Sequence, residues 1–176
     1  MRAFISIDFP EDIKEEIKKI QRRLPEFKGK FTEEENLHLT LKFLGEIDEE
    51  KAEEIKEKLK EIKFKKFEAE IDDIGVFSEK FIRIVWLGID KKCKDLWKLQ
   101  EEIDNKLEDL FGRERRFMGH ITIARIKNIK DKKKFLDELT KVKADFEFEV
   151  SNFILKESTL KEEGPEYKNI EIFNLE

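Results

Sequence analysis

Cysteine, histidine and glycine are scarce in this sequence, and each shortage excludes a class of protein. Cys93 is the only cysteine among 176 residues, which excludes an internal disulfide framework and a metal site built from several cysteines of one chain. No apolar run approaches the ~18–20 residues of a membrane span, and the first ten residues lack the basic segment of a signal peptide. None of the seven glycines falls in a G-x-x-x-x-G-K-[ST] or G-x-G-x-x-G loop. We therefore expect a soluble cytoplasmic protein that is neither an ATP- nor an NAD-binding enzyme of the familiar kinds.

Charged residues are abundant, but their signs nearly cancel. There are 37 Lys and Arg against 42 Asp and Glu, a net charge of −5, so no overall positive field attracts nucleic acid. One segment, residues 113–127, is locally basic, with five cations against one acid. Hydrophobic residues make up 39% and include 16 phenylalanines, which is enough to bury a sizeable core.

Hydrophobic periodicity predicts two successive sets of strands and helices. The expected strands are 3–9, 37–44, 67–76, 81–89, 120–126, 144–155 and 167–175, and the expected helices are 10–24, 48–62, 90–112 and 132–142. Pro10 and Asp48 suit helix starts, and we expect a loop between the first helix and the second strand. Because no low-complexity linker divides the chain, we expect a single domain of two packed lobes over residues 1–176.

Both histidines of the chain stand in the pattern His-x-Thr-x with apolar x, as His38-Leu39-Thr40-Leu41 and His120-Ile121-Thr122-Ile123. Because side chains alternate along a strand, each motif presents an imidazole and a hydroxyl on one face and buries the other. If the halves are related by a pseudo-twofold axis, both faces line one cleft. With an ordinary pKa near ~6.5, two imidazoles can act as base and acid at one centre. Two hydroxyls can hold phosphate oxygens, so the pattern predicts phosphodiester chemistry without a metal.

Three other interpretations stay open. Each histidine could be a hydrogen-bonded structural residue, the pair could belong to a metal site completed by remote carboxylates, or the protein could be a non-catalytic RNA-binding module. Strict alternation also places Lys42 on the same face as His38, as a weak substrate-binding candidate, whereas it places Arg125 on the face opposite His120.

Four segments around these motifs carry a family resemblance: residues 2–8, 38–45, 120–125 and 155–160, the last followed by Gly164, Pro165 and Tyr167. They resemble the two-histidine phosphoesterase superfamily, specifically the RNA 2′,3′-cyclic phosphodiesterases, also called 2′-5′ RNA ligases. The similarity extends over nearly the whole chain. It implies an α/β (α+β) fold with two pseudo-symmetric lobes of mainly antiparallel sheet, outer helices and a central groove lined by both motifs.

The resemblance also implies an activity and roles for individual residues. The activity is hydrolysis of an RNA terminal 2′,3′-cyclic phosphate to a 2′-phosphomonoester, with no metal or other cofactor. His38 is then the proton donor and His120 the proton acceptor, Thr40 and Thr122 hold the phosphate, and Arg125 binds substrate. The expected partners are RNA ends that carry the cyclic phosphate, tRNA fragments among them, and the protein is expected to act as a monomer away from membranes. A 2′-5′ RNA ligase and a cyclic phosphodiesterase of small nucleotides are alternatives that use the same site.

Overall fold

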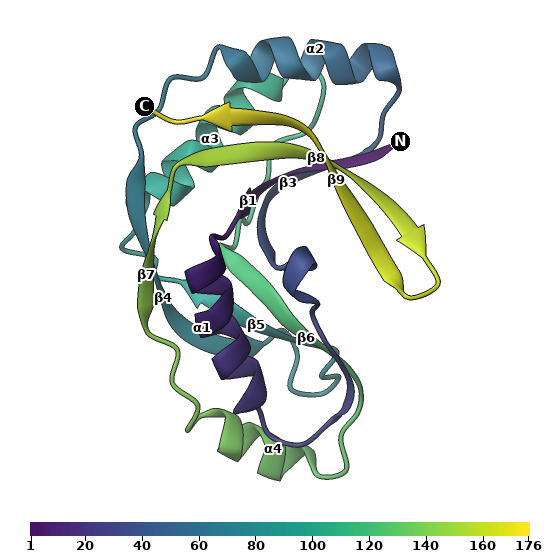
Figure 1. The fold of residues 1–176 in the computed structure, drawn as a ribbon, viewed down its shortest axis with the longest axis vertical. Helices are drawn as coiled ribbons and strands as arrows, with labels where there is room; N and C mark the ends of the chain where they lie inside the picture. Colours follow the sequence, from purple (N-terminus) through teal and green to yellow (C-terminus); the bar gives the residue numbers. More distant parts are fainter.

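The computed structural model describes residues 1–176, which form nine strands, four α-helices and one short 3₁₀ helix (Figure 1). The strands are β1 (Arg2–Asp8), β2 (Lys28–Phe31), β3 (His38–Glu46), β4 (Phe67–Val76), β5 (Ile84–Ile89), β6 (His120–Asn128), β7 (Phe146–Val150), β8 (Asn152–Lys161) and β9 (Gly164–Asn174). The helices are α1 (Glu11–Arg22), η1 (Glu34–Asn36), α2 (Glu49–Lys60), α3 (Lys94–Leu107) and α4 (Lys132–Leu139). None of them has the length and apolar character that a membrane-spanning helix needs.

All nine strands belong to one sheet, in the order β7-β4-β5-β6-β3-β1-β8-β9, and β2 pairs with β6 beside this path. The sheet has two halves that meet where β3 pairs with β6 through a single residue pair, Leu39 and Ile121. In Figure 1, α2 and α3 lie beside the half that contains β8 and β9, and α1 and α4 lie beside the half that contains β4 to β6. The predicted α/β class, with a mainly antiparallel sheet and outer helices, is confirmed. That the halves form one two-lobed domain stays a prediction.

The helix starts follow the local sequence signals. The Asp48 carboxylate accepts a hydrogen bond from the backbone N–H of Lys51 at 2.7 Å and so caps α2. Pro10 precedes α1, and its carbonyl oxygen accepts bonds from the N–H groups of Ile13 and Lys14. The stripe of α1 formed by Ile13, Ile17 and Ile20 is buried, because an apolar face at this spacing packs on the sheet. Both expectations about these helix starts are confirmed.

Two strand predictions are wrong. Residues 28–31, expected in a loop, form β2 and extend the sheet at β6. The single strand expected over 144–155 is two strands separated at Ser151: β7 pairs with β4, and β8 pairs with β1 in the other half of the sheet. The apolar alternation holds from Ala144 to Val150 and stops at Ser151 and Asn152, after which three apolar residues follow one another. The sequence thus contained a sign of this break, which the prediction of one strand overlooked.

Candidate active site

The two His-x-Thr-x motifs lie side by side and line one cleft of about 730 Å³. His38 and Thr40 come from β3, and His120 and Thr122 come from β6. Because Leu39 and Ile121 are antiparallel partners at the junction of the two half-sheets, the residues on either side of them project to the opposite face. Leu39 and Ile121 are fully buried on the core face. The cleft is therefore located where the two halves of the sheet join.

Both imidazoles are held in the same orientation. Nδ1 of His38 lies 2.7 Å from the carbonyl oxygen of Asn36, and Nδ1 of His120 lies 3.0 Å from that of Met118. A carbonyl oxygen only accepts, so each Nδ1 carries a proton and each Nε2 is left for chemistry. Nε2 of His38 lies 3.0 Å from the Thr40 hydroxyl, which can donate to it. Each neutral imidazole can thus accept a proton at Nε2, and each protonated one can donate from there.

A β-bulge in β6 brings Arg125 into the cleft. In β6, Ala124 faces Val85 but Thr122 faces Trp86, so Ile123 is an extra residue. An extra residue reverses the alternation beyond it. Ala124 is therefore buried and Arg125 lines the cleft with both histidines, although strict alternation predicts the opposite face.

The matching bulge in β3 makes the prediction for Lys42 wrong. Ile5 faces Lys42 but Ser6 faces Thr40, so Leu41 is the extra residue. The Lys42 side chain is 2% exposed and points away from the cleft, whereas Phe43, at 71% exposure, lines it. Lys42 therefore cannot bind substrate in this cleft. Phe43 is the counterpart of Arg125, so one wall offers an aromatic ring where the other offers a cation.

The chain's only two glutamines hold these bulges. The buried Gln21 side chain of α1 donates to the carbonyl oxygen of Ile123 at 2.9 Å, and Gln100 of α3 donates to that of Leu41 at 3.4 Å. Each glutamine thus donates to the carbonyl of an extra residue. The Ile123 carbonyl oxygen also accepts from the backbone N–H of Thr32 at 2.9 Å. The sequence reasoning missed this role, although a pair of glutamines, one in each repeat, was a visible signal.

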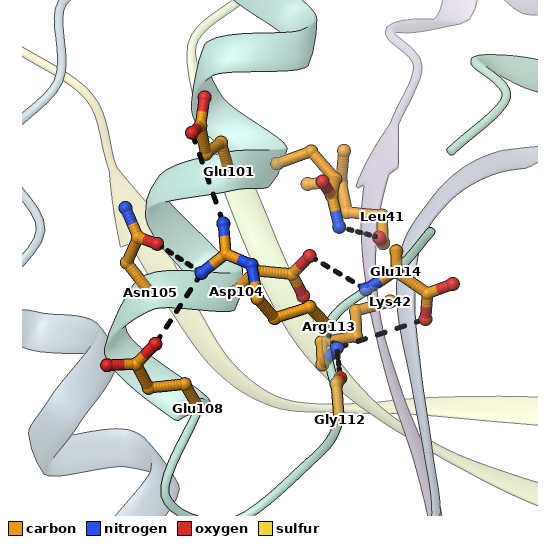
Figure 2. Close-up of polar contacts among 10 residues, drawn as sticks. Leu41, Lys42, Glu101, Asp104, Asn105, Glu108, Gly112, Arg113 and Glu114 are labelled. Atoms are coloured by element: carbon orange, nitrogen blue, oxygen red, sulfur yellow. Dashed lines mark hydrogen bonds and ion pairs between the residues drawn. The ribbon is translucent and has the colours of Figure 1, made fainter. Parts of the chain in front are cut away.

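Behind β3, Lys42 forms a buried ion pair (Figure 2). Its ammonium lies 2.6 Å from an Asp104 carboxylate oxygen and 2.7 Å from the Gly112 carbonyl oxygen. The second oxygen of Asp104 accepts from the backbone N–H of Glu114 at 2.9 Å. These contacts join β3, α3 and the loop that leads to β6, so Lys42 supports the site from behind.

The cations of the basic segment 113–127 lie in different places in the folded protein. The Arg113 guanidinium is held by Asn105 and Glu101 of α3 and by Glu108, the residue after the helix (Figure 2). Arg125 and Lys127 line the cleft, whereas Arg115 and Arg116 do not. The expected basic run is therefore not one surface, and only its last part faces the site.

Aromatic rings surround His38. The rings of Phe4 and Tyr167 lie 5.2 Å and 5.1 Å from the imidazole, centroid to centroid. Burial lowers the pKa of His38 below its ordinary value; the hydrogen bond to Asn36 opposes this shift and the Lys156 ammonium adds to it. Burial also raises the pKa of the Tyr167 phenol, which stays a hydrogen-bond donor at neutral pH. Tyr167 is thus a further residue of the cleft.

Gly119, which precedes His120, occupies a tightly packed position. A Cβ there would lie 2.8 Å from Cδ2 of Leu96 and 3.3 Å from Cβ of Ile89. The Gly119 carbonyl oxygen accepts from the N–H of Ile89 at 2.9 Å. The entry to β6 is therefore fixed by packing and by this bond, and a larger residue would require the Leu96 side chain or the strand to shift.

Known proteins share both the sequence and the fold. The family model described as LigT like Phosphoesterase matches twice, over residues 7–86 and 87–167. A Methanocaldococcus jannaschii protein named RNA 2′,3′-cyclic phosphodiesterase is 43% identical over 175 residues, which are 97% of this chain and 98% of that protein. A protein of the same name from Archaeoglobus fulgidus is 36% identical over 98% of this chain and 99% of its own length.

Solved structures agree with these matches. The crystal structure of TT0787 of Thermus thermophilus superposes with a TM-score of 0.85 at 27% identity and covers 99% of this chain and 97% of that chain. E. coli LigT in apo form superposes with a TM-score of 0.82 at 27% identity. The match covers 99% of this chain and 96% of that chain. The double match of the family model reflects the two repeats that supply one His-x-Thr-x motif each. The chain therefore belongs to the LigT-like phosphoesterase family.

Proposed function

We propose that this protein is an RNA 2′,3′-cyclic phosphodiesterase that hydrolyses a terminal cyclic phosphate to a 2′-phosphomonoester. The observation that carries the proposal is the pair of equally oriented imidazoles, each with Nδ1 on a carbonyl oxygen and a threonine two residues on, in one cleft. Relatives from several species bear this enzyme's name. E. coli LigT, at 26% identity, has been crystallised with phosphate and with 3′-AMP, which supports a phosphate site in this cleft.

The reaction needs one proton acceptor and one proton donor. In our proposal Nε2 of His120 takes a proton from the water that attacks phosphorus. The bond between phosphorus and the 3′ oxygen breaks, and Nε2 of His38 gives its proton to that oxygen. The Thr40 and Thr122 hydroxyls donate hydrogen bonds to the phosphate oxygens. The products are a 3′-hydroxyl and a 2′-phosphomonoester, and no metal or nucleotide takes part.

The donor role of His38 requires its protonated form. Burial lowers the pKa of His38, which favours the neutral imidazole in the free protein. The cyclic phosphodiester carries one negative charge, and its binding beside Nε2 favours the imidazolium. Substrate binding and protonation of His38 are thus coupled in this mechanism.

The activity is tested with an RNA oligonucleotide that ends in a 2′,3′-cyclic phosphate, incubated with EDTA and without ATP. We expect turnover, and phosphorus NMR of the product should show a 2′-phosphomonoester. RNA binding without turnover would instead indicate a binding module, and activity lost in EDTA and restored by a divalent metal would indicate a metallohydrolase.

Arg125 is expected to bind the phosphate directly. Replacing it by Met should lower kcat/KM about 10- to 100-fold, chiefly through KM, because a charge-assisted hydrogen bond contributes ~1.5–3 kcal/mol. The matched control is Arg83→Met. Arg83 is exposed on the neighbouring chain segment, donates to the carbonyl oxygen of Lys127 and does not line the cleft. Equal effects of the two substitutions on steady-state kinetics would contradict a specific role for Arg125.

The proposal extends to the cellular setting. We propose that the protein acts as a monomer. We propose that it acts in the cytoplasm on RNA ends with a cyclic phosphate, tRNA fragments among them.

A further inference from the structure

The two catalytic histidines are equivalent in position but not in surroundings. In the half-sheet of β1 and β3, the residue opposite His38 is Asp8. In the half-sheet of β5 and β6, the residue opposite His120 is Gly88. The repeats therefore place a carboxylate beside one imidazole and no side chain at the matching position beside the other.

A second charge accompanies Asp8. The ammonium of Lys156, on β8, lies 2.6 Å from a carboxylate oxygen of Asp8, and the Lys156 side chain is 4% exposed. Lys156 faces Phe4 across the β1–β8 ladder, and its ammonium lies 5.9 Å from the Tyr167 ring centroid. Phe4 and Tyr167 are the rings that contact His38. The ion pair thus lies directly behind the aromatic contacts of this one histidine.

A buried ion pair contributes little to stability compared with apolar packing, because desolvation offsets the attraction. Its charges nevertheless act strongly on a neighbouring group shielded from water. The groups that face His38 are Asp8 from β1, Lys156 from β8, Tyr167 from β9 and His120 from β6. Among the charges on these elements, Lys156 favours the neutral imidazole and Asp8 favours the imidazolium.

We propose that Asp8 and Lys156 are positioning residues that tune the proton affinity of His38, in addition to the effect of its burial, and so help to divide the donor and acceptor roles between the two histidines. The inference rests on the proposed function for its catalytic meaning. Its electrostatic part concerns the free protein and can be measured without substrate.

The first experiment is an NMR titration of the imidazoles, which is simple because the chain has only two histidines. Lys156→Met keeps the length of the side chain and removes its charge. We expect the His38 midpoint to rise by roughly half a pH unit, the order of effect of one nearby charge, and the His120 midpoint to stay. Asp8→Asn should move the His38 midpoint down. Lys168→Met is the matched control, an exposed lysine on β9 next to Tyr167.

The double variant Asp8→Asn with Lys156→Met guards against misfolding, because neither charge is then left buried alone. Its His38 midpoint should lie between those of the two single variants. A His38 midpoint that is the same in Lys156→Met and Lys168→Met overturns the inference. Equal movement of both histidines also overturns it, since that would indicate a general change in structure.

The pH dependence of kcat/KM then connects the pair to catalysis. If His38 is the donor, activity is lost as the pH rises through its pKa, so Lys156→Met should move the alkaline limb to higher pH. Movement of the acidic limb instead would keep the inference about Asp8 and Lys156 but reverse the roles proposed for the two histidines. If no variant turns over RNA, the proposed function fails, while the NMR titration still tests this inference.

Discussion

Replacing His38 or His120 by Asn is expected to lower kcat for the cyclic-phosphate RNA by about 10²- to 10⁴-fold, the range typical of general acid–base residues. Each Nε2 is the only group of its ring that is free for proton transfer, because Nδ1 is bound to a backbone carbonyl. In the proposed mechanism the two imidazoles act on one phosphate, so the double variant should lose little more than the more impaired single variant. Single-turnover kinetics with the RNA substrate measures these losses.

The matched control is Asn128→Ala, at the exposed far end of β6 and outside the cleft. It should keep the activity of the original protein. Loss of one imidazole hydrogen bond costs only about 1 kcal/mol, so both histidine variants should unfold cooperatively near the original temperature. Retention of more than a tenth of the activity by either histidine variant would show that this imidazole does not transfer a proton.

Breaking the ion pair behind β3 is expected to have the largest effect on stability. Asp104→Ala should lower the free energy of unfolding by about 3–5 kcal/mol, because the buried Lys42 ammonium then loses its close counter-charge. Only the partly exposed Glu114 carboxylate, 3.9 Å away, remains beside it. The same substitution removes the acceptor of the Glu114 N–H. Urea denaturation measures the change. The double variant Lys42→Met with Asp104→Leu should recover most of the loss, since apolar side chains can replace a buried ion pair.

The control for this experiment is Asp109→Ala, which breaks an ion pair with Lys58 of similar length, 2.9 Å, at the surface. Because water screens exposed pairs, its denaturation midpoint should move far less than that of Asp104→Ala. If the two substitutions have equal effects, burial does not decide the strength of the Lys42 pair. A double variant less stable than Asp104→Ala would contradict the charge-based explanation.

Much of the site follows from local sequence. The period of two along a strand places an imidazole and a hydroxyl on one face of each motif, whatever the rest of the fold does. His38, Thr40, His120 and Thr122 were therefore predictable, and the repeated motif indicated one shared cleft. The helix starts at Pro10 and Asp48 depend on neighbours within four residues, so they were predictable as well.

The predictions for Lys42 and Arg125 show where local reasoning ends. Both lie beyond a β-bulge. Whether a strand forms a bulge depends on its partner strand and on which group donates a hydrogen bond to the carbonyl oxygen of the extra residue. Here Gln21, 102 positions before Ile123 in the sequence, donates to that carbonyl. Strand β2 was missed for the same reason, since its pairing with β6 depends on residues distant in sequence. The break at Ser151, by contrast, coincides with a local end of the apolar alternation.

The sequence by itself determined the chemistry: two imidazoles, two hydroxyls and their common faces, because strand periodicity is a property of neighbouring residues. Only the tertiary structure decided which cations face the cleft and which charges lie behind His38. Arg125 enters the cleft through a bulge that α1 stabilises, and Asp8 and Lys156 meet through the pairing of three strands distant in sequence. Such contacts exist only once the chain has folded, so no local pattern encodes them.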